Sequence, residues 1–328
     1  WLTREEFLAL NAAAQLIPGP NSTELAIHIG HRRGGWKGLV AAGAGFILPA
    51  AGLTLLVAWA YVRFGALPDV RAALAGVKLV VLVIVARALW GFGRTALTSP
   101  LLWALALAAA AATWAGINEL LVLLLAGLVA WGVATNIRAA ALLPALASID
   151  PLTAYRSPLT LFASFAKIGA VLFGSGYVLY AFIHAEFVDR LGWLTTAQVT
   201  DAIAAGQITP GPLFSTATFV GYLVAGWKGA LIATAGIFLP AFTFVALSAP
   251  LLPYLERHPG LKAARDGVVA ASLGLLAATA VALGQDALHV SLFLAASVLI
   301  PATALVLRTK VSPIWLVTGG ALLGVLLG

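Results

Sequence analysis

The chain has 328 residues, of which 62% are hydrophobic and only 9% are charged, against roughly 25% charged in ordinary soluble domains. Its mean hydropathy of +1.01 indicates an all-α polytopic membrane protein rather than a soluble domain. The absence of Cys excludes disulfides and thiolate metal sites, and the scattered His and acidic residues predict no metal and no cofactor. The basic residues behind the net charge of +7 do not cluster with aromatic ones, so we expect them to face the lipid bilayer rather than nucleic acid.

The first predicted element is a pair of short helices around a proline motif. Residues 2–17 and 21–31 are apolar and flank Pro18-Gly19-Pro20, and a proline pair around a glycine cannot continue a helix. The two helices would measure about 24 Å and 16 Å at ~1.5 Å per residue, which together exceed one crossing of a ~30 Å bilayer core. We therefore expect a re-entrant hairpin, with a single continuous crossing as the alternative.

The rest of the chain divides into apolar stretches and one polar link. Spans are expected at about 36–62, 70–92, 100–115 and 117–134, the first of them interrupted by Pro49. Residues 136–158 are polar and proline-marked, and are expected to link a first repeat, 1–135, to a second repeat, 159–328. In the second repeat we expect a span at 159–187, a hairpin at 196–225, and spans at 227–252, 260–284, 286–307 and 311–327.

The two repeats match in sequence. Pro18-Gly19-Pro20 recurs as Pro210-Gly211-Pro212, Gly35-Trp36-Lys37-Gly38 as Gly226-Trp227-Lys228-Gly229, and Leu48-Pro49-Ala50 as Leu239-Pro240-Ala241. Five spans and one hairpin per repeat would give inverted-topology repeats, a common transporter design. If the hairpins cross the membrane instead, the repeats are parallel. Nothing before Trp1 matches 159–187, so we expect one further span ahead of Trp1 in the full protein.

The two proline motifs are candidate anion sites. Each leaves a helix N-terminus, with its partial positive charge, within the membrane region, and paired interrupted helices usually mark a transporter's substrate site. The predicted substrate-binding residues are Pro18, Gly19, Pro20, Asn21, Ser22, Thr23, Pro210, Gly211, Pro212, Ser215 and Thr216. Gln15 and Gln207 precede the motifs by the same spacing, and would either donate to substrate or satisfy carbonyls freed by the prolines.

Four ionisable residues complete the predicted site. Lys78 and Lys167 each lie eight residues into an apolar run, where a charge is costly enough to indicate a function; the alternative is that each side chain reaches the membrane surface. Glu24 and His28 share one helix face and are the predicted proton-coupling pair, with an interfacial helix end as the alternative.

The acids near Trp193 are weaker candidates. Glu186 and Asp189 are expected at the membrane interface. Asp201 lies inside the first leg of the second hairpin and is the one acid of this group that we connect with a proton path.

The sequence resembles a known family. The stretches PGPNSTELAIHIG, FILPA, FAKIGAVLFGSGYV, GQITPGPLFSTATFVGYLVAG and IFLPAF are similar to the two halves of the chromate ion transporter family. The resemblance covers almost the whole chain. It implies a bacterial or archaeal inner-membrane protein that exports chromate, a sulfate-like dianion, with coupling to the proton gradient. The first span of the family, with its FGG-type motif, is missing here.

Other functions stay open at this point. The same architecture would serve a sulfate or other anion permease. An integral membrane enzyme acting on lipid phosphates would need clustered acids or a basic and acidic pair at a membrane face, and a purely structural membrane protein predicts no buried lysines. We expect a transporter rather than an enzyme, with an oxyanion and protons as its small partners, and the sequence leaves a homodimer undecided.

Overall fold

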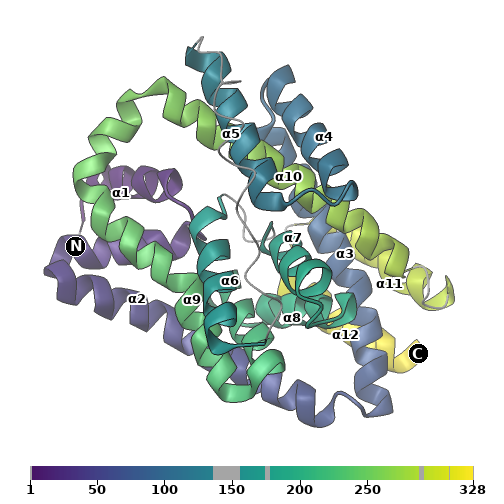
Figure 1. The fold of residues 1–328 in the computed structure, drawn as a ribbon. Helices are drawn as coiled ribbons and strands as arrows, with labels where there is room; N and C mark the ends of the chain where they lie inside the picture. Colours follow the sequence, from purple (N-terminus) through teal and green to yellow (C-terminus); the bar gives the residue numbers. More distant parts are fainter. Residues whose placement is uncertain (1, 136–155, 174–177, 288–291, 310, 328) are drawn as a thin grey trace.

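A computed structural model describes residues 2–135, 156–173, 178–287, 292–309 and 311–327. Every regular element within these ranges is helical (Figure 1), which confirms the all-α prediction for the described part of the chain. Most of the predicted linker 136–158 lies outside the described residues, and so do all three residues of Gly174-Ser175-Gly176.

The helices follow the predicted order. Those of the first repeat are α1 (Arg4–Leu16), α2 (Ser22–Phe64), α3 (Pro68–Ala96), α4 (Pro100–Trp114) and α5 (Glu119–Thr135). The second repeat has α6 (Pro158–Val171), α7 (Leu179–His184), a π-helical turn Ala185–Arg190, α8 (Thr196–Ile208), a 3₁₀ turn Leu213–Ser215, α9 (Thr216–Arg257), α10 (Pro259–Ala287), α11 (Leu292–Arg308) and α12 (Pro313–Leu327). Prolines open α3, α4 and α6, where a missing backbone N–H costs nothing.

Stretches that match in sequence adopt matching local structures. Helices α1 and α8 both have 13 residues, and each begins with a capping box, formed by Thr3 with Glu6 and by Thr195 with Gln198. Helices α3 and α10 both have 29 residues. The motif glycines share one backbone conformation, with φ of 138° at Gly19 and 137° at Gly211. The orientation of the repeats in the membrane stays a prediction.

A sharp kink divides α2, and another divides α9. The backbone leaves helical geometry at Gly34 and Gly35 in α2, and at Ala225 and Gly226 in α9. The α2 segments fold back on each other so closely that a Cβ at Gly30 would lie 2.3 Å from the Gly38 carbonyl oxygen. The predicted boundary between the short helix 21–31 and the span from residue 36 falls at this kink.

The predicted interruption at Pro49 is wrong. Within α2, non-helical backbone occurs at Gly34 and Gly35 and not at Pro49, which lies inside the helix. A proline removes one helical hydrogen bond, but small backbone adjustments can absorb the loss without ending the helix.

Four helical stretches in the described residues are long and apolar enough to cross a membrane. They are Ser22–Phe64, Pro68–Ala96, Leu213–Leu247 and Pro259–Gln285. The expected spans at 100–115, 117–134, 286–307 and 311–327 form helices of 15 or 17 residues, which at ~1.5 Å per residue fall short of a ~30 Å core. Exposed side chains on α2 include Leu48, Leu56 and Trp59, an apolar outer surface suited to lipid.

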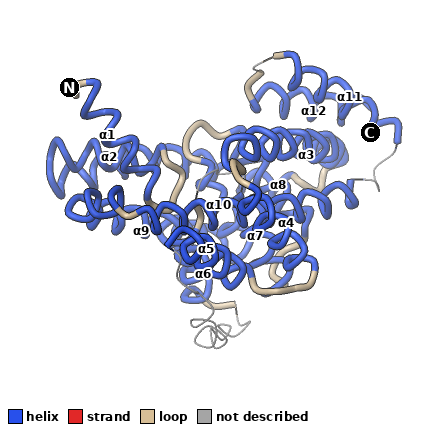
Figure 2. The backbone as a smooth tube through the Cα atoms, turned by 90° about the horizontal axis from the view of Figure 1, so that it is seen from above, coloured by secondary structure: helices blue, strands red, loops and turns tan. Residues whose placement is uncertain are grey.

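The two repeats interlock. Helix α10 of the second repeat packs against α4 and α5 of the first, while α3 of the first packs against α11 and α12 of the second. Small residues allow close approach: a Cβ at Gly76 of α3 would lie 1.9 Å from the Gly320 carbonyl oxygen of α12. Figure 2 shows α11 and α12 at one edge of the molecule beside α3, and α1, α2 and α9 at the opposite edge.

Candidate functional site

The second proline motif rests on a helix of the first repeat. A Cβ at Gly211 would lie 2.4 Å from the Cβ of Ala50 in α2. One turn further along α2, the Thr54 hydroxyl donates to Ser215 Oγ at 3.1 Å, with both residues buried. Two predicted site residues, Gly211 and Ser215, therefore lie at a contact between the repeats.

Lys78 lies beside the leg that leads into this second motif. Its Nζ is 3.7 Å from Asp201 Oδ2 on α8, and the Tyr61 hydroxyl of α2 donates to the same oxygen at 2.9 Å. The Asp201 side chain is 3% exposed and that of Lys78 is 31% exposed, so the acid is buried while the lysine side chain is only partly buried. Asp201 Oδ1 is buried with no hydrogen-bond partner among the described residues.

Tyr61 is a site residue that sequence reasoning missed. It lies on the same face of α2 as Ala50 and Thr54, at spacings of 11 and 7 residues. This face of α2 contacts the second proline motif at Gly211 and α8 at Asp201. A tyrosine near the end of an apolar helix is ordinarily read as a membrane-surface residue, and Asp201, its partner, is 140 positions away.

The first proline motif contacts the second repeat. The Gly19 N–H donates to the Leu172 carbonyl at 2.8 Å, just beyond the end of α6. Ile17, directly before the motif, belongs to a buried apolar cluster with Ala241 and Val245 of α9. Each proline motif thus lies near the Leu-Pro-Ala segment of the opposite repeat.

Buried polar groups without partners surround the first motif. Thr23, Glu24 and His28 are 0%, 0% and 5% exposed. Both carboxylate oxygens of Glu24, Oγ1 of Thr23 and Nε2 of His28 have no hydrogen-bond partner within the described ranges. The Glu24 carboxylate lies directly against Gly19, where a Cβ would be 1.8 Å from Oε1. Unsatisfied groups of this kind cost about 1–3 kcal/mol each and are expected at functional sites.

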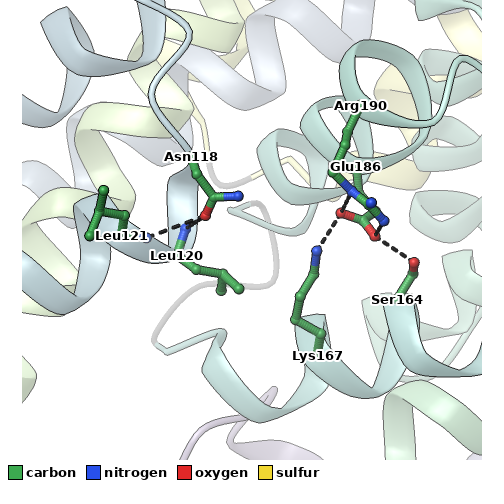
Figure 3. Close-up of polar contacts among 7 residues, drawn as sticks. All are labelled: Asn118, Leu120, Leu121, Ser164, Lys167, Glu186 and Arg190. Atoms are coloured by element: carbon green, nitrogen blue, oxygen red, sulfur yellow. Dashed lines mark hydrogen bonds and ion pairs between the residues drawn. The ribbon is translucent and has the colours of Figure 1, made fainter. Parts of the chain in front are cut away.

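Lys167 is engaged by an acid, as Figure 3 shows. Glu186 accepts hydrogen bonds from the Lys167 ammonium, from the Ser164 hydroxyl and from the Arg190 guanidinium, the last through Nε at 2.9 Å. Glu186 is 3% exposed, so its carboxylate lies inside the protein rather than at the surface. Lys167 and Arg190 supply the charges that make burial of this carboxylate tolerable, while its position at the membrane interface stays a prediction.

The remaining predicted residues do not gather at one point. Gln15 and Asn21 line a polar cavity of about 290 Å³ that also contains Arg265, a residue that sequence reasoning did not single out. Gln207, the counterpart of Gln15, is partly buried, and its Nε2 has no partner in the described structure. The candidate site therefore consists of two polar regions, one at each proline motif.

Buried charges between interrupted helices in an apolar helical protein define the class of a membrane transport protein. Comparison with known sequences specifies the family: the model described as "Chromate transporter" matches residues 1–131 and 159–325. The chain belongs to the chromate transporter family.

Curated relatives match over most of their length. The chromate transport protein of Cupriavidus metallidurans is 33% identical, over 99% of this chain and 84% of the relative. That of Pseudomonas aeruginosa is 34% identical, over 87% of this chain and 73% of the relative. The probable chromate transport protein of Synechococcus elongatus is 31% identical, over 88% and 77% respectively. No solved structure matches the chain significantly.

Proposed function

We propose that this protein is a secondary active transporter that exports chromate, or a similar tetrahedral oxyanion, across the inner membrane in exchange for protons. The family match across both repeats carries this proposal. Three relatives whose names specify chromate transport are similar over most of the chain. The protein would act within the lipid bilayer, as a monomer or as a homodimer.

Lys78 is the proposed cation for the oxyanion. Its side chain is partly exposed, and its ammonium is 3.7 Å from Asp201, longer than a hydrogen bond. An arriving oxyanion would compete with Asp201 for this charge, and the donors of the second proline motif lie on the same hairpin. Asp201 would neutralise Lys78 whenever the site is empty, which avoids leaving a lone charge in an apolar region.

Lys167 has a lesser role in this proposal than the sequence suggested. Its charge is already matched by Glu186, which Arg190 also holds. We assign Lys167 to keeping α6 against the π-helical turn, and to the oxyanion path only as a source of positive potential.

Glu24 and His28 are the proposed proton-coupling groups. They are buried and without partners among the described residues, so neither is committed to a structural hydrogen bond. A carboxyl and an imidazole one turn apart can pass a proton between them. We propose a cycle of alternating access around the two broken helices. After chromate is released outside, the empty carrier returns to its inward-facing state with a proton on Glu24 or His28.

The test is chromate flux in proteoliposomes that contain the complete protein. A pH gradient is imposed in each direction, and excess sulfate is added in parallel. We expect flux that follows the proton gradient, that sulfate inhibits weakly, and that Lys78→Gln reduces at least about tenfold through loss of a charged contact. Arg71→Gln, on an exposed position of the same helix, is the matched control.

Three outcomes would count against the proposal. Equal transport of sulfate would assign a general anion permease, and flux that ignores the pH gradient would remove the proton coupling. A Lys78→Gln protein that carries chromate at the wild-type rate would remove Lys78 from the site.

A further inference from the structure

The cavity at the first proline motif is lined by groups that can bind an anion. It measures about 290 Å³ and is lined by Gln15, Asn21, Thr95, Thr98, Phe173 and Arg265, together with Asp266 and Val269. Amide, hydroxyl and guanidinium groups therefore converge from α1, α3 and α10 on one space, with room for a small hydrated anion. Asn21 is a predicted substrate-binding residue, but no cation has yet been assigned to this cavity, and Arg265 has no role so far.

Arg265 lines the cavity, and only part of its guanidinium is engaged by a neighbouring acid. Its Nε and Nη2 both donate to one oxygen of the neighbouring acid, Asp266 Oδ1, at 3.1 Å and 2.7 Å. Nη1 makes no hydrogen bond within the described part of the chain, and the side chain is 27% exposed. A guanidinium held on one edge still presents donors in the planar arrangement that suits an oxyanion.

Arg265 lies one helical turn from the position that corresponds to Lys78. Helices α3 and α10 are matching 29-residue elements, and the register that places Gly35 on Gly226 also places Lys78 on Val269. Val269 lines the cavity, and Arg265 lies one turn earlier on the same helix face. Lys78 of α3 approaches α8, the leg before the second motif, while Arg265 of α10 shares the cavity with Gln15 at the end of α1, the leg before the first.

We propose that this cavity is a second binding site for the tetrahedral oxyanion, with Arg265 as its cation and Gln15 and Asn21 as amide donors. The inference rests on the proposed function for the identity of the ligand. Asp266 holds Arg265 while the cavity is empty, as Asp201 holds Lys78. In α10, Val269 stands where α3 has Lys78, but Arg265 of the same helix supplies a cation to the first proline motif. An oxyanion that crosses the protein would therefore meet Arg265 at the first motif and Lys78 at the second.

The test is calorimetric titration of the detergent-solubilised protein with chromate and, separately, with sulfate. Arg265→Gln should weaken binding of the oxyanion at least about tenfold, because it removes a charged donor. Asp266→Asn should strengthen binding by releasing the guanidinium. Lys262→Gln, at an exposed position of α10, should leave binding unchanged.

The Asp266→Asn variant separates a binding site from a structural ion pair. If the pair only stabilises α10, both substitutions lower the melting temperature and neither changes the affinity, which would overturn the proposal. Wild-type affinity in a well-folded Arg265→Gln protein would overturn it as well. Failure of the proposed function gives a different result, because the wild-type protein would then bind sulfate and not chromate. In that case the affinities of the wild-type and Arg265→Gln proteins are compared for sulfate.

Discussion

Glu186 ties α6 to the π-helical turn that follows α7. Ser164 and Lys167 of α6 and Arg190 of the turn all donate to its carboxylate, whose side chain is 4% exposed. Removing one member of a buried ion pair leaves charge without a partner, which typically costs 3–5 kcal/mol. The stability of this region therefore depends on one acid.

Glu186→Gln should lower the free energy of unfolding by about 3 kcal/mol, because Lys167 and Arg190 then face each other without the carboxylate between them. Thermal unfolding in detergent measures the change. Asp189→Asn is the matched control, since the Asp189 side chain is 61% exposed and pairs with His184 at 3.0 Å, a surface contact worth little. Equal melting temperatures for the two variants would refute this role of Glu186.

Sequence reasoning found ionisable residues but not their partners. Lys78, Lys167 and Glu24 stand out because a charge inside an apolar run is costly wherever it lies. Their surroundings depend on packing between distant segments, such as the contact of Lys78 on α3 with Asp201 on α8. For the same reason neither Tyr61, which donates to Asp201, nor Arg265, which lines the cavity at the first proline motif, stood out in the sequence. Arg265 lies near the start of its helix, where a cation is ordinarily read as facing headgroups.

At the scale of single elements, glycines make the two kinked helices possible. In α9, a Cβ at Gly221 would lie 2.3 Å from the Gly229 carbonyl oxygen, the same close approach that Gly30 and Gly38 make in α2. Because the contact is between backbones, no side chain can rotate away to make room.

Gly30→Ala should destabilise the protein by about 1–3 kcal/mol, the usual cost of forcing atoms into a packed site. Gly45→Ala in the same helix is the control: nothing lies within 4 Å of its added Cβ, and alanine favours a helix by up to about 1 kcal/mol over glycine. Thermal unfolding of both variants decides the matter, and a Gly30→Ala protein as stable as Gly45→Ala would exclude the close contact.

The order of the helices was largely predictable from the sequence, but the points at which helices are interrupted were not. Apolar length indicated where α3 and α4 lie. Pro49 was misread because its effect depends on the surroundings of the helix rather than on the residue itself. Within the predicted span 159–187, α6 ends at Val171 and α7 begins at Leu179.

At the scale of the whole molecule, each repeat lacks a packing surface that the other supplies. Helix α10 has α4 and α5 as neighbours, and α3 has α11 and α12. The repeats therefore cannot move past each other as two separate bodies without breaking these contacts. Alternating access would instead involve groups of helices drawn from both repeats.

A chain cut within the predicted linker 136–158 should fold when both parts are expressed together, because the interlocked helices hold the parts to each other. Either part alone should aggregate or be degraded, since its long helix would lose its neighbours. Co-purification through a tag on one part measures assembly. A first repeat that is monodisperse and helical on its own would contradict interlocking as a requirement for folding.

The second proline motif packs against α2 at Ala50 and Thr54, so we expect the two to separate when the proposed site beside Lys78 opens during transport. The chain has no Cys, and the hydroxyls of Thr54 and Ser215 are 3.1 Å apart, which makes the double variant Thr54→Cys, Ser215→Cys a suitable lock. Chromate flux is measured in proteoliposomes after oxidation and again after reduction, with each single-cysteine variant taken through the same treatment. The account predicts that flux stops when the disulfide forms and returns on reduction, whereas the single variants do not respond to the oxidant. Undiminished flux through a fully cross-linked protein would contradict it.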